Sequence, residues 1–346
     1  MKSYRLEINM EVIQDILRFL DFQLDAAPEM YGAFHLSFFA ASFVAAFVLC
    51  LLWKLGVIKD VKKVVLITAI IVLVFEIYKQ INFTFGYTDG ITVNYQWYAF
   101  PFQFCSTPLF IGLLCGLTRG KVNQNFAAYL ATYALFAGLG VMFYPATVFV
   151  PTLGISIQTM ICHGSMITIA IFLFYTGYVK AERATILKAL PVFVAMVGIA
   201  VTLNEIAYLV GLTETHTFNM FFLSSHFESD LPVYSLVHNA LYLWEPPFGY
   251  IICVLLYIAG FTAAAFAVLH VPILVKYIKD KDFDADYAEE DAARAAEEEK
   301  KQKDKKDLET ANERIRELEA KLAEKEKAAE QPAEQPVDEI PAGDAE

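Results

Sequence analysis

Charge is scarce in the first 278 residues of this 346-residue chain. The formal net charge is −12, of which −11 falls on residues 279–346 and only −1 on residues 1–278. Hydrophobic residues make up 57% of the sequence, above the roughly 45–50% that is usual for soluble domains. This imbalance argues against an ordinary soluble domain over residues 1–278, and the acidic tail argues against nucleic acid as a direct partner.

Cysteine is absent from the polar loops. All five cysteines fall inside apolar runs: Cys50, Cys105, Cys115, Cys162 and Cys253. No disulfide framework is therefore predicted. The histidines lack the spacing of metal ligands, and we predict neither a metal site nor a cofactor. The first 30 residues carry charges throughout and lack a short apolar core before a small-residue cleavage site, so we expect no cleavable signal peptide.

Long apolar runs are what the sequence does contain. Crossing an apolar core of about 30 Å takes roughly 20 helical residues, and a helix satisfies its own backbone hydrogen bonds inside a bilayer. The sequence predicts an all-α, polytopic transmembrane helix bundle over residues 31–278, with spans at about 36–56, 64–85, 98–117, 126–146, 154–178, 189–212 and 248–275. The run at 98–117 is the shortest and is a candidate re-entrant segment, which leaves six spans as the alternative to seven.

Lysine and arginine are unevenly distributed among the loops. The loop after the first run contains Lys54, Lys59, Lys62 and Lys63, and the loops after the third and fifth runs are also basic. The segments 147–153 and 213–247 contain no lysine or arginine. Because basic loops stay on the cytoplasmic side, we expect the amino terminus outside and the tail in the cytoplasm.

The two ends of the chain differ from the bundle. Residues 1–30 form an amphipathic segment, with Val12, Ile13, Ile16, Leu17 and Leu20 on one helical face and Glu11, Asp15, Arg18 and Asp21 on the other. It is too charged to span and either lies in the membrane interface or packs against the bundle. Residues 279–330 form a charged, helical, coiled-coil-prone tail, and the proline-containing stretch 331–346 is predicted to be disordered.

Several polar residues lie inside the predicted spans, where ionisable groups are costly and commonly mark a functional site. From the helical rise of 1.5 Å per residue, Cys105 and Glu205 lie about 10 Å below the outer ends of their runs, Glu76 about 12 Å and His163 about 14 Å. Neighbouring spans run in opposite directions, yet these residues fall at one depth. The sequence therefore predicts a polar layer in the outer half of the bundle, flanked by Gln103 and Asn204.

A cysteine and a histidine in one layer permit nucleophilic acyl chemistry. A thiolate is the nucleophile, and a neighbouring imidazole can take up the thiol proton. A carboxylate or an amide, here Glu76, Asn204 or Glu205, can orient the imidazole. Each residue also has a structural interpretation, because cysteine is a small apolar residue in helices and a histidine can simply join two helices by a hydrogen bond.

Two short motifs carry a resemblance to a known family. PFQFCS (101–106) and MICHGSM (160–166) resemble the paired signatures of the YwaF / transmembrane protein 164 family of integral membrane proteins. Weaker similarities occur in YGAFHL (31–36), NMFFL (219–223) and PPFGY (246–250). The resemblance covers about residues 30–275 and leaves out the tail.

This resemblance implies a bundle of six or seven helices and, for the animal branch, a lipid acyltransferase that moves a fatty acyl chain between phospholipids. It makes Cys105 the acyl-accepting nucleophile and His163 its base. The bacterial pattern tends to have histidine where Gln103 and Cys162 stand in this sequence. Gln103 can still donate a hydrogen bond to an oxyanion, but it cannot act as a base.

Three hypotheses follow. In the first, the protein is a lipid acyltransferase or hydrolase that uses Cys105 and His163 on membrane phospholipids. In the second, it is a carrier or sensor whose polar layer binds a small molecule, although the hydropathy shows no inverted repeat. In the third, it is a scaffold in which residues 284–330 self-associate weakly or bind a cytoplasmic protein.

Overall fold

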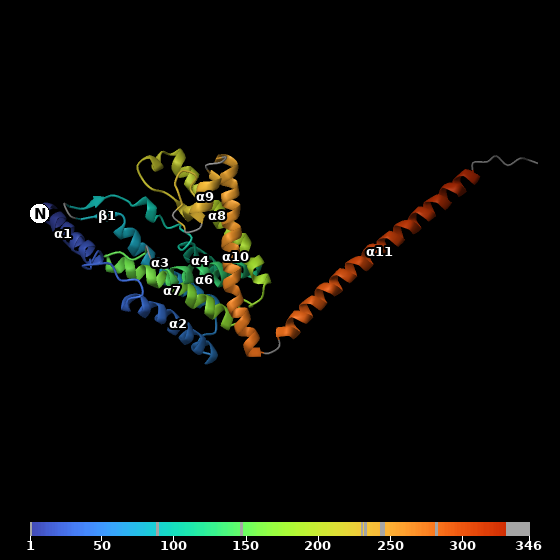
Figure 1. Cartoon of the computed structure of the whole chain (residues 1–346), viewed down its shortest axis with the longest axis horizontal. Helices are drawn as coiled ribbons and strands as arrows, with labels where there is room; N and C mark the ends of the chain where they lie inside the picture. Colours follow the sequence, from blue (N-terminus) through green and yellow to red (C-terminus); the bar gives the residue numbers. More distant parts are fainter. Residues whose placement is uncertain are drawn as a thin grey trace, which may run out of the picture. The chain divides into compact units, whose positions relative to one another are not determined.

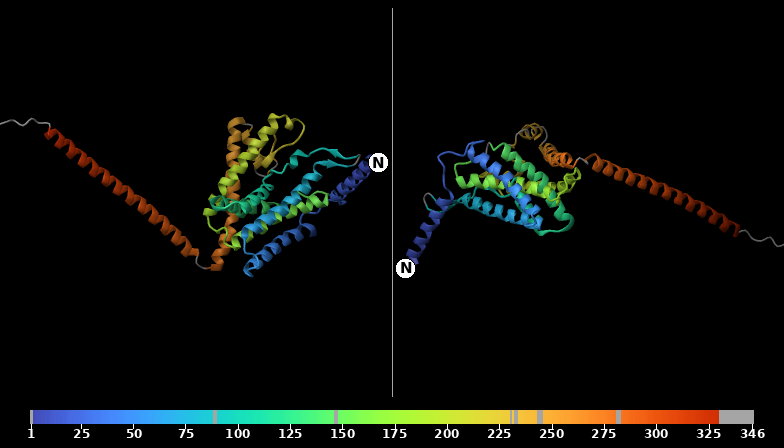
Figure 2. Two further views of the ribbon diagram at one scale, coloured as in Figure 1. Left: turned by 180° about the vertical axis from the view of Figure 1, so that it is seen from behind. Right: turned by 90° about the horizontal axis from the view of Figure 1, so that it is seen from below.

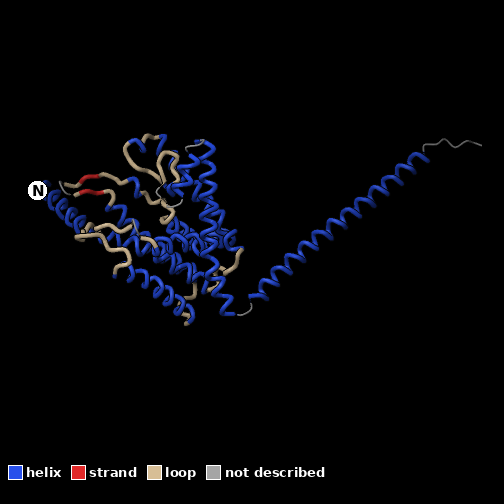
Figure 3. The backbone as a smooth tube through the Cα atoms, viewed as in Figure 1, coloured by secondary structure: helices blue, strands red, loops and turns tan. Residues whose placement is uncertain are grey.

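The computed structural model is an all-α protein, as the apolar runs predict. It describes residues 2–87, 90–145, 148–229, 231, 234–242, 246–280 and 283–329. The chain divides into two compact units, Met1–Lys276 and Tyr277–Glu346, which are described separately. The strands of the described residues are a short antiparallel pair, β1 (Phe85–Gly86) and β2 (Thr92–Val93), and helix dominates elsewhere (Figure 3).

Six helices in the described residues are long and apolar enough to cross a membrane. They are α2 (Ala33–Lys54), α3 (Val61–Asn82), the continuous stretch Gly120–Phe143, α7 (Leu153–Tyr175), α8 (Ala184–Leu209) and the segment Phe248–Ile278 of α10 (Pro246–Asp280) (Figure 1). Many of their outward side chains are large and apolar, including Phe47, Val74 and Leu255. Such a surface suits contact with lipid hydrocarbon.

The predicted run at 98–117 is not one helix. It consists of the 3₁₀ turn η1 (Trp97–Ala99), an irregular segment and the short helix α4 (Thr107–Leu117). Pro101 explains the break, because proline has no backbone N–H and disfavours helical geometry in the residue before it. Phe100 accordingly has an extended backbone, with ψ of 134°. The alternative of six spans therefore fits the described residues better than seven.

A π-helical turn interrupts the third spanning stretch. Helix α5 (Gly120–Tyr129) passes into the π turn η2 (Leu130–Ala134) and then into α6 (Leu135–Phe143). A π turn inserts one residue into a helix and is frequent at functional sites. Here the rings of Tyr129 and Tyr133 stack with centroids 5.6 Å apart, and both side chains are buried.

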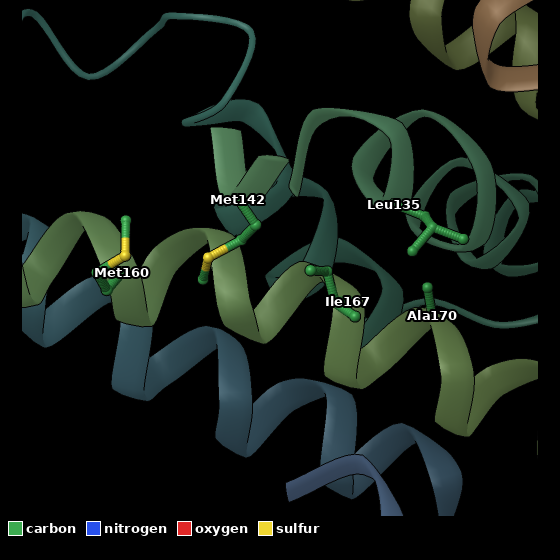
Figure 4. Close-up of a cluster of buried hydrophobic side chains, with 5 residues drawn as sticks. All are labelled: Leu135, Met142, Met160, Ile167 and Ala170. Carbon is green, nitrogen blue, oxygen red and sulfur yellow. The ribbon is translucent and has the colours of Figure 1, made fainter. Parts of the chain in front are cut away.

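Helix α7 lies at the centre of the bundle and packs against α2, α3 and α6 (Figures 1 and 2). Glycine permits one of these close approaches, because a Cβ atom at Gly138 of α6 would lie 2.8 Å from the backbone oxygen of His163. Next to this contact, α6 and α7 contribute a cluster of buried apolar side chains: Leu135, Met142, Met160, Ile167 and Ala170 (Figure 4).

A loop between α8 and α10 folds back onto the bundle. It contains the 3₁₀ turns η3 (Leu212–Glu214) and η4 (Met220–Phe222) and the helix α9 (Tyr234–Tyr242). Phe221 and Phe222 have positive φ values of 59° and 55°, a conformation that is costly for large side chains and persists only where other contacts impose it. These contacts come from the site described below.

Helix α1 (Lys2–Leu20) precedes the bundle within the first unit. In the second unit, α11 (Phe283–Ala329) is one continuous helix, on which Leu308, Ile315 and Leu318 are exposed. Helix is therefore confirmed over most of the predicted tail, whereas its self-association stays a prediction. The segment 331–346, predicted to be disordered, lies outside the described residues.

Candidate functional site

Cys105 lies in the irregular segment between η1 and α4. Its side chain is half-buried, and its backbone oxygen accepts a hydrogen bond from the thiol of Cys162 on α7, with sulfur and oxygen 3.8 Å apart. Cys162 itself is buried. Of these two cysteines, Cys162 therefore holds the segment in place, while Cys105 is the one with partial access to its surroundings.

A buried ion pair lies on α3 near these cysteines. The ammonium group of Lys79 is 2.8 Å from a carboxylate oxygen of Glu76, and Gln80 donates a hydrogen bond of 2.7 Å to the same oxygen. Gln158 of α7 donates to the other carboxylate oxygen at 3.4 Å. Both charged residues are within electrostatic range of Cys105. Glu76 is thus saturated by its own partners and forms no hydrogen bond with His163.

His163 is buried on α7, and only one of its two ring nitrogens has a hydrogen-bond partner among the described residues. Nδ1 lies 2.7 Å from the backbone oxygen of Thr159. A carbonyl oxygen can only accept, so Nδ1 carries the hydrogen and, in the neutral ring, Nε2 keeps a free lone pair. Nε2 is buried and has no hydrogen-bond partner among the described residues. This is the tautomer that a general base requires.

Cys105 and His163 are not hydrogen-bonded to each other in the part of the chain that the structure describes. They share a neighbour instead, because Lys79 lies within electrostatic range of both residues. The predicted pair therefore belongs to one region of the bundle, with Nε2 of His163 unpaired among the described residues and the Cys105 thiol next to Ser106. Hydrogen bonds between catalytic groups are often formed only when substrate is present.

Gln103 and Asn204, predicted as supporting residues, hold the backbone of η4. Gln103 donates to the oxygen of Asn219 at 2.9 Å and accepts from the N–H of Phe221 at 3.0 Å. Asn204 accepts from the N–H of Met220 at 2.7 Å and donates to its oxygen at 3.0 Å. These bonds impose the positive φ values of the turn, and neither side chain contacts His163 through a hydrogen bond.

Glu205, the remaining predicted residue, lies in a different environment. It accepts a hydrogen bond of 2.5 Å from Ser225, and one of its oxygens is 3.4 Å from Nε2 of His226. The ring of His226 stacks on Tyr208 with centroids 3.5 Å apart. Glu205 therefore anchors the loop after α8, and the single layer predicted from depth alone contains at least two separate polar groups.

Aromatic side chains cluster around Phe104, the residue before Cys105. Phe104 contacts the rings of Phe193, Phe221 and Phe261, with centroids 5.1–5.7 Å apart. The same three rings surround Tyr257 of α10. Sequence reasoning missed Tyr257, since a tyrosine in an apolar run carries no ionisable signal at neutral pH.

No three histidine, cysteine or acidic side chains within the described ranges lie close enough together to hold a metal ion. All five cysteines are free thiols.

The site lies within a segment that matches a known family. The TMEM164 family model matches residues 30–271, more than half of the chain. The chain belongs to the TMEM164 family. No match is found among curated proteins or among solved structures.

The matched range shows which part of this chain corresponds to the TMEM164 family model. It begins just before α2, ends within α10, and includes both the Cys105 segment and His163. Helices α1 and α11 lie outside it. Family membership and the six apolar helices together establish an integral, multi-pass membrane protein.

Proposed function

We propose that this TMEM164-family protein transfers an acyl group between membrane phospholipids through a thioester on Cys105. The observation that carries the proposal is the state of His163: a buried imidazole whose Nδ1 is held by Thr159 and whose Nε2 lone pair is unused among the described residues. A histidine that only joined two helices would use both nitrogens, since an unsatisfied buried polar atom costs about 1–3 kcal/mol.

The first half of the reaction proceeds by addition and elimination. The Cys105 thiol gives its proton to Nε2 of His163, and the sulfur forms a bond to the carbonyl carbon of a lipid ester. The carbonyl π electrons move to the oxygen, which becomes an oxyanion. Collapse of this intermediate breaks the ester C–O bond, and the departing lysolipid oxygen takes the proton back from the imidazolium.

The second half reverses the roles. The hydroxyl group of a lysolipid, or a water molecule, gives its proton to Nε2 and attacks the thioester carbonyl carbon. The Cys105 sulfur leaves and recovers the proton. A lysolipid acceptor gives acyl transfer and water gives hydrolysis, so the acceptor alone decides between these two outcomes.

A small apolar cavity of about 30 Å³ lies beside Cys162. Residues of α3, α4, the π turn and α7 line it, among them Val72, Pro108, Ala134 and Cys162. The Cys162 sulfur, one of its lining atoms, lies 3.8 Å from the backbone oxygen of Cys105. Its lining is mostly apolar, but the cavity is far smaller than a ligand pocket, so an acyl chain would have to enter by displacing these side chains or from the lipid-facing side.

The test is capture of the acyl group. The full-length protein, reconstituted in lipid with a radiolabelled phospholipid, should acquire label that hydroxylamine releases. Cys105→Ser and His163→Gln should abolish this label, and Cys50→Ser, at a buried cysteine of α2 outside the site, should retain it. Wild-type protein that stays unlabelled across phosphatidylcholine, phosphatidylethanolamine and phosphatidylglycerol donors would refute the proposal.

A binding or transport function is the second candidate, and the break at residues 100–106 favours it. Discontinuous helices in membranes commonly surround a ligand, because their freed backbone groups can bind polar atoms. In that case the buried Glu76–Lys79 pair would be the polar end of the ligand site, and Cys105→Ser would leave ligand binding unchanged.

A further inference from the structure

We propose that the hydroxyl group of Tyr257 donates the hydrogen bond that stabilises the oxyanion formed at the Cys105 thioester. This inference rests on the proposed acyl transfer and adds a catalytic residue to it. The sequence suggests Gln103 or a backbone amide as the oxyanion donor, but both ends of the Gln103 amide are hydrogen-bonded to the backbone of the η4 turn. The Gln103 side chain is therefore not free to take this role.

Tyr257 has an unused hydroxyl group inside the bundle. The residue is 1% exposed, and its hydroxyl oxygen is buried without a hydrogen-bond partner in the described part of the chain. Most buried polar atoms in native proteins are hydrogen-bonded, so an exception calls for an explanation. A substrate atom that the hydroxyl group binds during the reaction provides one.

The position of Tyr257 points to the reacting centre. Its ring stacks on Phe261, with centroids 4.1 Å apart and planes inclined by 19°. Phe104, the residue before Cys105, contacts the same Phe261 ring edge-on at 5.1 Å. The Tyr257 phenol and the Cys105 thiol are also close enough to interact electrostatically. The stacking fixes the ring, so that the hydroxyl group is held in place before substrate arrives.

The neighbouring Tyr129 cannot take this role. Thr107 donates its hydroxyl hydrogen to the oxygen of Phe104 at 2.9 Å. The 2.7 Å contact between Thr107 and Tyr129 therefore uses the hydrogen of Tyr129. Both tyrosines are within electrostatic range of Cys105, but Tyr257 is the one of the two whose O–H remains available.

Tyr133 provides a matched control. Thr262 of α10 donates its hydrogen to Ile258 at 2.6 Å, so Tyr133 must donate in its 2.8 Å contact with Thr262. Tyr133→Phe thus removes a satisfied hydroxyl group in the same aromatic cluster, whereas Tyr257→Phe removes an unsatisfied one. Both substitutions keep the ring and its packing.

The experiment measures the rate of acyl capture on Cys105 and the melting temperature of each full-length variant in lipid. Loss of an oxyanion donor typically lowers kcat by about 10²–10³-fold. We expect a loss of this size in kcat, not in KM, for Tyr257→Phe, with a melting temperature equal to or above that of the wild type. Tyr133→Phe should melt at a lower temperature and keep the wild-type rate.

Three outcomes would contradict the inference, and they can be told apart. A wild-type rate in Tyr257→Phe overturns the role of Tyr257 alone. A slower rate accompanied by a lower melting temperature assigns the residue to packing and also overturns it. Absence of label on the wild type refutes the proposed acyl transfer, and with it the role of Tyr257.

An independent observation concerns the apolar face of α1, which we infer lies in the interfacial region of the bilayer. Val12, Ile13, Ile16 and Phe19 are 44–80% exposed, and Leu17 alone among the apolar residues 10–19 is buried. Glu11, Asp15 and Arg18 lie on the opposite side of the helix. Packing against protein would bury the whole apolar face, whereas an interfacial helix presents it to lipid.

The carboxyl end of α1 is fixed at the rim of the bundle. Tyr78, in the last turns of α3, donates to the backbone oxygen of Leu20 at 2.6 Å, and the N–H of Leu153, the first residue of α7, donates to Phe22 at 3.0 Å. Figures 1 and 2 show α1 leaving the bundle from this end. The ends of spanning helices meet the bilayer surface, which places α1 at that level.

The charge of α1 indicates the kind of contact. Residues 2–20 contain three basic and three acidic residues, so attraction to anionic lipids is weak and burial of apolar area provides the binding. We therefore expect insertion into neutral phosphatidylcholine as well as into anionic membranes.

Spin labels on the full-length protein in phosphatidylcholine nanodiscs test this placement. Labels at Val12→Cys and Ile16→Cys should be relaxed by oxygen, which partitions into the bilayer, and shielded from a water-soluble nickel complex. Labels at Glu11→Cys and Asp15→Cys should show the reverse. The signal of the labelled wild type, which has five native cysteines, is subtracted as background. Access of nickel to all four positions, or dipolar broadening that shows a second copy against the apolar face, would contradict the inference.

Discussion

Lys79 and Glu76 form an ion pair of 2.8 Å inside the bundle, with side chains that are 14% and 7% exposed. Removal of one partner from a buried pair leaves an uncompensated charge and costs about 3–5 kcal/mol. We expect Glu76→Gln and Lys79→Met each to lower the free energy of unfolding by an amount of this order. The double variant should lose less unfolding free energy than the sum of the two single losses. Denaturant unfolding of all four proteins in a double-mutant cycle measures this difference. Additive losses would mean that the two charges are independent.

Gln103 should act on stability through the η4 turn. Gln103→Leu removes both hydrogen bonds to residues 219–221, which hold Phe221 at φ of 59°. We expect a loss of about 1–3 kcal/mol for each buried backbone group left unpaired, together with faster proteolysis between α8 and α9. Gln96→Leu is the control, since the Gln96 side chain donates an exposed 3.3 Å hydrogen bond to the backbone oxygen of Asn94. Equal proteolysis of the two variants would contradict this interpretation.

Two glycines of α6 should respond differently to the same substitution. A Cβ atom at Gly138 would lie 2.8 Å from the backbone oxygen of His163, whereas one at Gly140 would meet no heavy atom within 4 Å. Alanine stabilises an open helical site by about 0.5–1 kcal/mol, and overpacking costs about 1–3 kcal/mol. Thermal melting should therefore fall for Gly138→Ala and rise slightly for Gly140→Ala. Matching shifts in both variants would show that α6 and α7 are not in close contact at His163.

The apolar runs predict most of the fold, because in a bilayer a run of sufficient length leaves the backbone no alternative to helix. The run at 98–117 departs from this rule at Pro101. Its residues are apolar enough to span, but proline removes the backbone donor that a continuous helix needs. Pro101, near the start of the run at 98–117, is the residue from which the break could be predicted.

The candidate site could be predicted only in part. Depth along a helix follows from residue number, and it places Glu76, Cys105 and His163 at one level; in the structure Lys79, the ion-pair partner of Glu76, is within electrostatic range of both Cys105 and His163. Rotation about the helix axis does not follow from number, so the partners of Glu205 and Asn204 were not predictable. Tyr257 was missed for another reason: its significance lies in a hydrogen bond that it does not make to any described residue, and a sequence carries no record of an unused donor.

Tyr87 should make the attachment of α1 dependent on pH. Its hydroxyl group donates a hydrogen bond of 2.6 Å to Asp21, directly after α1. This bond and burial raise the pKa of Tyr87 from 10 to about 12. The folded protein therefore holds the proton more tightly than the unfolded chain, and the stabilisation is fully present below pH 10 and is lost as the pH rises through about 12.

The comparison of Tyr87→Phe with wild type across pH tests this dependence. The variant should melt at a lower temperature at pH 8, and the difference should shrink steadily above pH 10 as the wild type loses the contact. Tyr144 is 63% exposed, so the difference between Tyr144→Phe and the wild type should stay constant over the same range. A Tyr87→Phe difference that persists unchanged to pH 12 would mean that the hydrogen bond to Asp21 does not hold the end of α1.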